Sequence, residues 1–379
     1  MSDRSSSNLP LVSRREALRL LGVSAAATCA PTAIVGAQTP PFPEGAVIRT
    51  VLADLVPSAL VHGTTLFHEH LTHGPDWNAR MAARPSRAGR PVPPPRRDPI
   101  TGCGSSAWDD CANLDFMVEE LNRARRDGVV CIVDGTHPAG GRDIGFLTQM
   151  SRRSGMSVVA SGGYYVDEMY PPEITTMSEA QIAEELIQDA TSNPLGAFGE
   201  MGTSDEITPN ERKVFRAVGT AHVETGLPIF THTENGKCAE EQLDILESMG
   251  VPPERVAIGH LGSLVDPDVE VHTAICKRGA FVGFDRQGGR SDERNVPMIL
   301  RLLDAGYRDQ LLISADFGVN AWPNWQQNGG PGISRALTVF APKLREAGVP
   351  ESTIRGILVN NSRRFLAVVP RIPRPATQG

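Results

Sequence analysis

The sequence lacks the excess of positive charge that proteins binding nucleic acid or anionic membranes usually carry. Its 379 residues include 37 lysines and arginines against 44 aspartates and glutamates, which gives a formal net charge of -7 and a pI of about 5.8. We therefore expect neither nucleic acid nor a membrane as the main partner, and predict a small-molecule substrate instead. With 40% hydrophobic and 21% charged residues, the chain has enough apolar material for an ordinary globular core.

Cysteine is scarce, and no pair of cysteines has the spacing of a zinc site. Six cysteines occur, and they are scattered along the chain. Cys131 and Cys276 lie in apolar segments and are predicted to be buried as small hydrophobic residues. Cys103 and Cys111 lie close together in sequence, and either form a disulfide in an oxidising compartment or stay free.

The N-terminus has no apolar run long enough to span a membrane. The pair Arg14–Arg15 precedes a short, alanine-rich stretch that ends in small residues near Ala37. This arrangement resembles the twin-arginine signal of proteins exported in the folded state, although Ala17 stands where that signal usually has Phe. We expect residues 1–37 to be an export signal and 38–44 a linker, with the mature protein periplasmic or secreted.

Short β-rich runs alternate with helix signals along most of the chain, and no GxGxxG follows the first of them. "TTLFHEH" comes first, and seven further runs, among them "VVCIVDG", "LGAFGEMG" and "QLLISADFG", follow from Val129 onward. Thr208 and Glu211, with Pro209 between them, form a capping box that starts one of the helices. Eight βα units predict a parallel (β/α)8 barrel over 45–370 rather than a doubly wound sheet, with a tail at 371–379.

Two segments fall outside the repeating units. Residues 45–58 are expected to form a small hairpin, and a proline- and arginine-rich insertion of about 75–111 separates the first strand from its helix. The arginines of this insertion are predicted to be solvated rather than to form a binding patch. Because loops after barrel strands lie at the C-terminal face, the insertion is expected to overhang the functional site.

Residues of metal-ligand type end five of the predicted strands. They are His68 and His70 on the first strand, Glu200 on the fourth, His232 on the fifth, His260 on the sixth and Asp316 on the eighth. In a parallel barrel all six meet at one mouth. A lone histidine at a strand end is usually a hydrogen-bonded structural residue, but this ordered set predicts a binuclear metal centre with a carboxylate and a hydroxide between two divalent ions.

Zinc is the expected metal, and manganese, iron and cobalt suit the same ligands. The other histidines are interpreted differently from these six. His62, His222 and His272 are predicted to be surface or packing residues, and His73 and His137 lie near the mouth without an assigned role.

Five motifs in this order carry a family resemblance: "TTLFHEHL", "GEMGTS", "THTENG", "IGHLG" and "ISADFG". They resemble the phosphotriesterase family of the amidohydrolase superfamily, and the likeness runs from about residue 47 to 369. The resemblance implies a homodimer and a defined set of metal ligands: His68, His70 and Asp316 for the buried metal, His232 and His260 for the more exposed one, and Glu200 bridging both. Many members have a carboxylated lysine at the bridge. The glutamate at position 200 instead resembles the bridging residue of the phosphotriesterase homology and phosphotriesterase-related proteins.

The resemblance also implies residues that touch the substrate. "GFDRQGG" is similar to the end of the seventh strand in lactonase-like members, where Arg286 would contact a substrate carbonyl or carboxylate; the alternative is a surface ion pair with Asp285. Tyr164 or Tyr165 would donate to a substrate oxygen, and a packing role for one of them is the alternative. One departure stands out, since the acid that family members place shortly after His260 is missing and the next acid is Asp266.

These features predict a metal-dependent hydrolase in which the bridging hydroxide attacks an ester, lactone or amide carbonyl, with Asp316 passing the proton to the leaving group. Phosphotriester hydrolysis by the same site is the second hypothesis, and a non-catalytic periplasmic binding protein is the third. Glu200, Arg286 and the missing acid favour the first hypothesis. Trp322 and Trp325, after the eighth strand, are expected to line the pocket together with the insertion.

Overall fold

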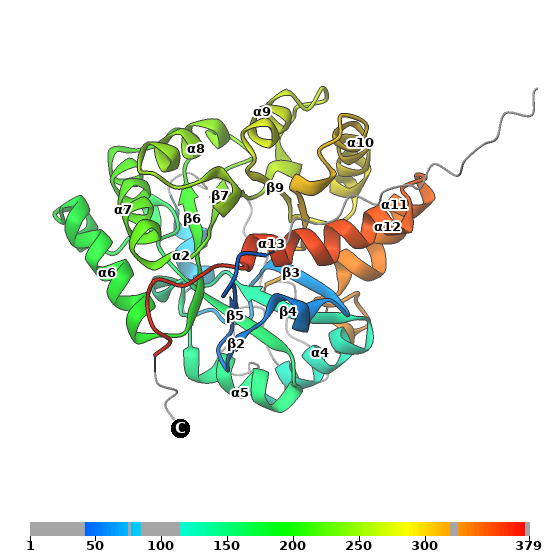
Figure 1. Ribbon diagram of the computed structural model, residues 1–379, viewed down its shortest axis with the longest axis horizontal. Coiled ribbons are helices and arrows are strands. Elements are labelled where there is room, and N and C mark those ends of the chain that lie inside the picture. The colour runs from blue at the N-terminus through cyan, green and yellow to red at the C-terminus, as the bar shows by residue number, and fades with distance from the viewer. Residues whose placement is uncertain (1–41, 75–76, 85–113, 319–324, 376–379) are drawn as a thin grey trace, which may run out of the picture. The chain divides into compact units, whose positions relative to one another are not determined.

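The computed structural model describes residues 42–74, 77–84, 114–318 and 325–375 (Figure 1). Several sequence predictions fall outside these residues. They are the export signal, most of the linker, the greater part of the insertion with Cys103 and Cys111, Trp322, and the end of the tail.

Eight parallel strands form one sheet whose neighbours follow chain order, as predicted. The strands are β3 (Thr64–Glu69), β4 (Val129–Asp134), β5 (Ser157–Gly162), β6 (Leu195–Thr203), β7 (Ile229–Thr233), β8 (Val256–Ile258), β9 (Phe281–Phe284) and β10 (Leu311–Ile313). The last and first strands meet where the backbone N–H of Asp316 donates to the carbonyl of His68 at 3.2 Å and that of His70 to the carbonyl of Phe317 at 2.8 Å. The (β/α)8 barrel is therefore confirmed.

Helices surround the strands (Figure 1). After β4 to β9 come α5 (Ile144–Ser154), α6 (Glu179–Ser192), α7 (Pro209–Thr225), α8 (Ala239–Ser248), α9 (Glu270–Arg278) and α10 (Arg290–Asp304). Between β3 and β4 lie α2 (Trp77–Ala83) and α4 (Leu114–Arg126). After β10 lie α11 (Ala341–Glu346), α12 (Glu351–Arg355) and α13 (Ser362–Leu366), with short π-helical segments directly before α11 and between α12 and α13.

Local signals in the sequence explain where these helices begin and end. The side chain of Thr208 accepts from the backbone of Glu211 while Glu211 bonds back to the backbone of Thr208, so the predicted capping box starts α7. Gly226 ends this helix with a φ of 77°, a left-handed conformation that glycine adopts without strain. The apolar stripe of α7, which includes Val214 and Phe215, is completely buried against the sheet.

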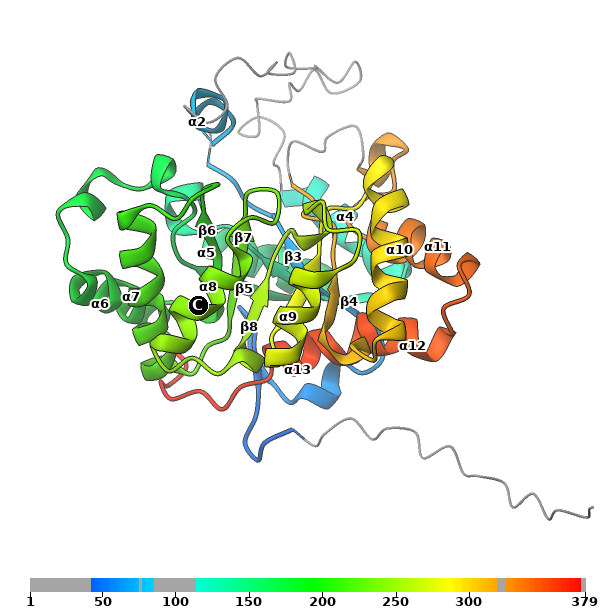
Figure 2. The ribbon, with the colours of Figure 1, turned by 90° about the horizontal axis from the view of Figure 1, so that it is seen from above.

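The two ends of the barrel are covered differently. The predicted hairpin is present as β1 (Ile48–Arg49) paired antiparallel with β2 (Asp54–Leu55), and β1 packs close to α13 and β6. Figure 2 shows α13 below the strands and α2 above them, so this described part of the insertion lies on the side where the strands end. Cys131 and Cys276 are buried as predicted, and burial raises the pKa of each thiol to about 12. Among the described residues, no helix is long and apolar enough to span a membrane.

Candidate metal centre

The six predicted ligands come together at the carboxyl ends of their strands. They form two groups of potential ligand atoms, and within each group the atoms lie within 4.8 Å of one another. Five of the six residues are buried, and Asp316 has a side chain that is 20% exposed. The predicted convergence at one mouth is therefore present in the structure.

The first group consists of the Nε2 atoms of His68 and His70 and the carboxylate of Asp316. Asp316 Oδ1 lies 3.2 Å from His70 Nε2 and 3.9 Å from His68 Nε2. Asp316 has a φ of 49°, in the left-handed region that non-glycine residues rarely adopt. Such strained backbone is commonly found where a side chain must be directed at a functional site.

The second group consists of Glu200, His232 and His260. Glu200 Oε1 lies 2.7 Å from His232 Nδ1 and 2.8 Å from His260 Nε2. The same carboxylate faces the first group, with Oε1 3.5 Å from His68 Nε2 and Oε2 3.7 Å from His70 Nε2. Glu200 therefore occupies the position between the groups that the sequence predicts for a bridge.

The chemistry of these residues fits divalent cations. His68 Nε2 is buried and has no hydrogen-bond partner among the described residues, so a lone pair points into the cluster unsatisfied. Burial lowers the pKa of His68, yet Glu200 and Asp285 together raise it well above its usual value. Surroundings that favour positive charge on an imidazole also favour a cation beside it, and imidazole with carboxylate is the donor set of zinc and related metals.

The outward nitrogens of three histidines are fixed by hydrogen bonds that leave Nε2 free as a ligand. Asp285 accepts from Nδ1 of His68 at 2.8 Å and from Nδ1 of His260 at 2.9 Å. His70 Nδ1 lies 3.2 Å from Thr136 Oγ1, which gives its own proton to the carbonyl of Thr72 and therefore accepts from the ring. Contacts of this kind set the tautomer and orientation of metal-binding histidines.

Asp285 was missed as a site residue, and its predicted alternative role is wrong. It is completely buried between His68 and His260 instead of pairing with Arg286 at the surface. Burial raises the pKa of Asp285, but the two imidazoles lower it well below its usual range. Arg286 turns to the cluster itself, where its Nε donates to Asp316 Oδ2 at 3.1 Å.

Glu69, the central residue of "HEH", is a second carboxylate that the sequence did not assign. It points away from the two histidines beside it and accepts from Ser314 Oγ at 2.7 Å and from the backbone N–H groups of Ala315 at 3.0 Å and Phe317 at 2.6 Å. The residue between those two N–H groups is Asp316. Burial raises the pKa of Glu69 to about 8, although these donors lower it.

Only one of the two candidate tyrosines reaches the cluster. The hydroxyl of Tyr165 lies 3.2 Å from His232 Nε2, whereas Tyr164 donates to Glu185 on α6 at 2.7 Å. Tyr164 therefore turns to α6 in this structure, and its contact with the substrate stays a prediction. Burial raises the pKa of Tyr165 well above its usual value, so its hydroxyl stays protonated as a donor.

The remaining histidines occupy the predicted kinds of position. His62 is exposed, while His222 is buried with Nδ1 donating to the carbonyl of Leu227 at 2.6 Å. His272 is buried and bound to Asp266 at 3.1 Å, so Asp266 is engaged in another contact instead of supplying the missing acid. Near the mouth, His73 stacks on His70 with ring centroids 4.9 Å apart.

The prediction that Trp325 lines the pocket is wrong. It is completely buried, with ring centroids 4.7 Å from Phe317 and 5.7 Å from Phe116. Its ring therefore packs against Phe317, the residue that follows Asp316.

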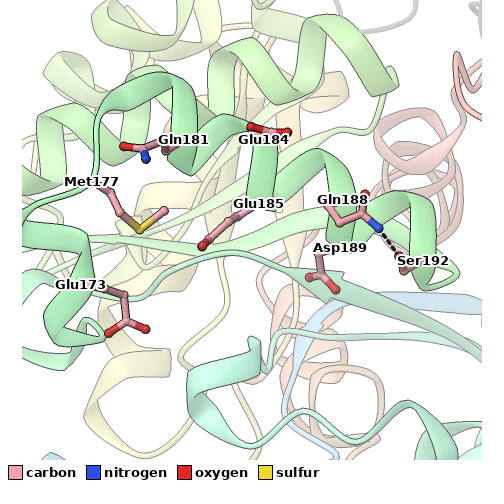
Figure 3. A pocket seen from close by; sticks show the side chains of 8 residues that line it. All are labelled: Glu173, Met177, Gln181, Glu184, Glu185, Gln188, Asp189 and Ser192. Carbon is pink, nitrogen blue, oxygen red and sulfur yellow. Dashed lines mark hydrogen bonds between the residues drawn. The ribbon is translucent and has the colours of Figure 1, made fainter.

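A separate hollow runs along α6, outside the barrel mouth (Figure 3). Two of its carboxylates already have partners, since Glu185 accepts from Tyr164 and Asp189 from Arg142. None of the metal-centre residues lines this hollow, whose lining is Glu173, Met177, Gln181, Glu184, Glu185, Gln188, Asp189 and Ser192.

Comparisons with known proteins agree with this geometry. The model of the Phosphotriesterase family matches residues 47–366. The phosphotriesterase homology protein of Escherichia coli (strain K12) is 33% identical, and the match covers 66% of this chain and 88% of that protein. A crystal structure of the phosphotriesterase homology protein from Escherichia coli with phosphate in the active site superposes with a TM-score of 0.68. That match has 30% sequence identity and covers 80% of this chain and 99% of the other. The aryldialkylphosphatase of Saccharolobus solfataricus is 33% identical over 66% of this chain and 84% of its own. The N-acetyltaurine hydrolase of Danio rerio is 26% identical, and the match covers 84% of this chain and 97% of that protein.

Proposed function

This chain belongs to the phosphotriesterase family of hydrolases, and we propose that it uses two divalent ions at the barrel mouth to cleave a carboxylic ester, lactone or amide. The observation that carries the proposal is the position of Glu200, whose carboxylate faces His232 and His260 on one side and His68 and His70 on the other. With Asp316, this is a donor set for two ions that share one carboxylate.

His68, His70 and Asp316 would hold one ion, His232 and His260 the other, and Glu200 both. When bound, such ions supply a nucleophilic water at neutral pH and polarise the bond under attack. Asp316 is placed to accept the proton released in that attack. Burial raises its pKa, but His70, the other histidines and Arg286 lower it well below its usual range, so it is ionised and ready to accept.

The fate of that proton favours a substrate whose leaving group must be protonated before it departs. Asp316 Oδ2 is bonded to Arg286, and a guanidinium cannot accept a proton. Asp266, the next acid after His260, is engaged with His272. The proton on Asp316 would therefore pass to the leaving oxygen or nitrogen of the substrate, which suits esters, lactones and amides.

Two further side chains would act on the substrate. Tyr165, kept protonated by its burial, would donate to a substrate oxygen. Arg286 has a side chain that is 32% exposed and would bind a substrate carbonyl or carboxylate. Support for an amide comes from the relative named N-acetyltaurine hydrolase. Support for phosphotriester hydrolysis, the second candidate, comes from the relative named aryldialkylphosphatase.

Metal content and a hydrolysis screen test the proposal together. We expect about two ions per chain by mass spectrometry, and hydrolysis of lactones or N-acyl amino acids ahead of a paraoxon-like phosphotriester. Glu200→Ala should lose metal and activity together. The matched control Glu185→Gln removes a carboxylate of α6 that lies outside the cluster, and should keep both. A wild-type protein that binds no metal after reloading would overturn the proposal, and metal binding without any turnover would favour a binding protein.

We further propose, from the sequence, that residues 1–37 direct export by the twin-arginine route and that the mature chain is a homodimer. The support is the pair Arg14–Arg15 ahead of a short apolar run, and the family to which the chain belongs. Replacing both arginines by lysine should retain the protein in the cytoplasm on fractionation. Light scattering of the mature protein should give twice the chain mass.

A further inference from the structure

Two oxygens lie near Nε2 of His232, the ring nitrogen that points away from the cluster. Its Nδ1 faces Glu200 and His260, so binding an ion there leaves the proton on Nε2, which points away from the cluster. The Tyr165 hydroxyl lies 3.2 Å from Nε2 and Glu234 Oε1 lies 3.6 Å from it. Outer contacts of this kind orient a metal-binding imidazole and tune its affinity.

A single buried guanidinium contacts both of these neighbours. Arg84 Nη2 donates to Glu234 Oε1 at 2.6 Å, and the Arg84 Cζ lies 5.7 Å from the centroid of the Tyr165 ring. Arg84 Nε donates to Glu168 at 2.8 Å, which fixes the guanidinium from the other side. With a side chain only 1% exposed, Arg84 is a buried charge paired with two carboxylates.

Arg84 comes from the insertion and follows α2 directly. This helix has other attachments, because Arg80 donates to the carbonyls of Ala139 at 2.7 Å and Met169 at 2.9 Å, and Trp77 stacks on His73 with nearly parallel rings 5.2 Å apart. Figure 2 places α2 over the ends of the strands. Docking of the helix and the contact with Glu234 therefore rest on different residues and can be separated.

We infer that Arg84 is a positioning residue of the second group: it holds Glu234 and Tyr165 against the outer nitrogen of His232 and so strengthens binding of the ion held by His232 and His260. This inference rests on the proposed function and assigns the insertion a role within it. The sites would be unequal, since this contact supports only the second group. The first group has its own support in Thr136, which accepts from His70, while Asp285 supports one ligand of each group.

Zinc titration of the full mature chain against a competing chelator tests the inference. We compare Arg84→Met, Glu234→Gln and the double variant, with Arg80→Met as the matched control on the same helix. Arg84→Met and Glu234→Gln should each weaken one of the two zinc ions, the one held by His232 and His260, by about 10-fold or more and leave the other unchanged. The double variant should bind no more weakly than the weaker single variant, because both substitutions remove one contact. Arg80→Met should bind both ions like the wild type.

Wild-type affinity for both ions in Arg84→Met and in Glu234→Gln would overturn the inference, as would an equal loss in Arg80→Met. Retention of the other ion shows that a variant is folded, and Glu234→Gln keeps the Arg84 to Glu168 pair if Arg84→Met fails to fold. A wild-type chain without metal would instead overturn the proposed function. Two ions in the wild type with unaltered variants would leave that function intact.

Discussion

Asp285 accepts two hydrogen bonds from His260, one from its backbone N–H at 2.8 Å and one from its Nδ1 at 2.9 Å. The second oxygen of the same carboxylate accepts from His68 Nδ1 at 2.8 Å. Because His68 belongs to the first group and His260 to the second, one buried carboxylate orients a ligand of each proposed ion.

Asp285→Asn should therefore weaken both ions, in contrast to Arg84→Met. An asparagine removes the negative charge that both imidazoles face. It also offers one acceptor oxygen only, and its NH2 faces a ring N–H that can no longer donate, so one imidazole loses its fixed tautomer as well. We expect a loss of about 10- to 100-fold in zinc affinity, measured by chelator competition. Affinity of both ions equal to the wild type would show that the hydrogen bonds to Asp285 do not support metal binding.

Glu69→Gln should displace Asp316 without altering any ligand. Glu69 accepts from backbone N–H groups on both sides of Asp316, and an amide replaces one acceptor oxygen by a donor. We expect kcat to fall more than KM changes, with a loss of about 1 to 3 kcal/mol in the free energy of unfolding for the unsatisfied buried group.

Glu119→Gln is the control for Glu69→Gln, since it removes an exposed carboxylate paired with Arg123 on α4. It should change neither turnover nor stability by more than about 0.5 kcal/mol. If Glu69→Gln alters stability but leaves kcat unchanged, the residue serves only the closure of the barrel.

The sequence was sufficient to predict the barrel and the ligands facing its axis, because both follow from periodic features. Strand-like runs repeat with helix caps, and residues that end parallel strands must meet at one edge. His232 and Glu200, 32 residues apart, are brought within 2.7 Å by that rule alone. The order of the strand ends along the chain is therefore sufficient to predict that these two side chains meet.

The supporting carboxylates could not be found in this way. Glu69 lies next to two ligands, but its side chain points to the opposite face of β3. Its partners are the Ser314 hydroxyl and the backbone N–H groups of Ala315 and Phe317, which all follow the end of β10. Arg84 reaches Glu234 across 150 residues from an insertion without periodicity. Such contacts depend on the packing of loops on the barrel, which no repeat in the sequence records.

His222 should make stability depend on pH in a defined direction. Burial lowers the pKa of His222 below 6.5, although its hydrogen bond to Leu227 raises it. The folded state therefore prefers the neutral imidazole, and the stability it provides is full above about pH 6.5 and declines as the pH falls below that value. This residue lies on α7 and is hydrogen-bonded to the carbonyl of Leu227, so it reports on folding apart from the metal centre.

His222→Gln isolates this contribution. We expect the variant to be about 1 kcal/mol less stable than the wild type at pH 8, because the bond to Leu227 is weakened, and the difference to shrink at pH 5.5. Urea unfolding at both pH values measures it. A difference that stays constant or grows as the pH falls would contradict a lowered pKa.

Arg286→Met should discriminate among substrates. The guanidinium is partly exposed at the mouth and bonded to Asp316, so it can meet an anionic group of the substrate without leaving the cluster. A desolvated charged hydrogen bond contributes about 1.5 to 3 kcal/mol, which corresponds to a decrease of roughly 10- to 150-fold in kcat/KM for N-acyl amino acids. An uncharged lactone has no carboxylate for Arg286 to bind, so the substitution affects its hydrolysis only through Asp316. The decrease in kcat/KM for the lactone should therefore be smaller. Arg290→Met, an exposed arginine at the start of α10, controls for loss of charge. Equal decreases for both substrates would mean that Arg286 acts only by holding Asp316, and that another residue recognises the carboxylate.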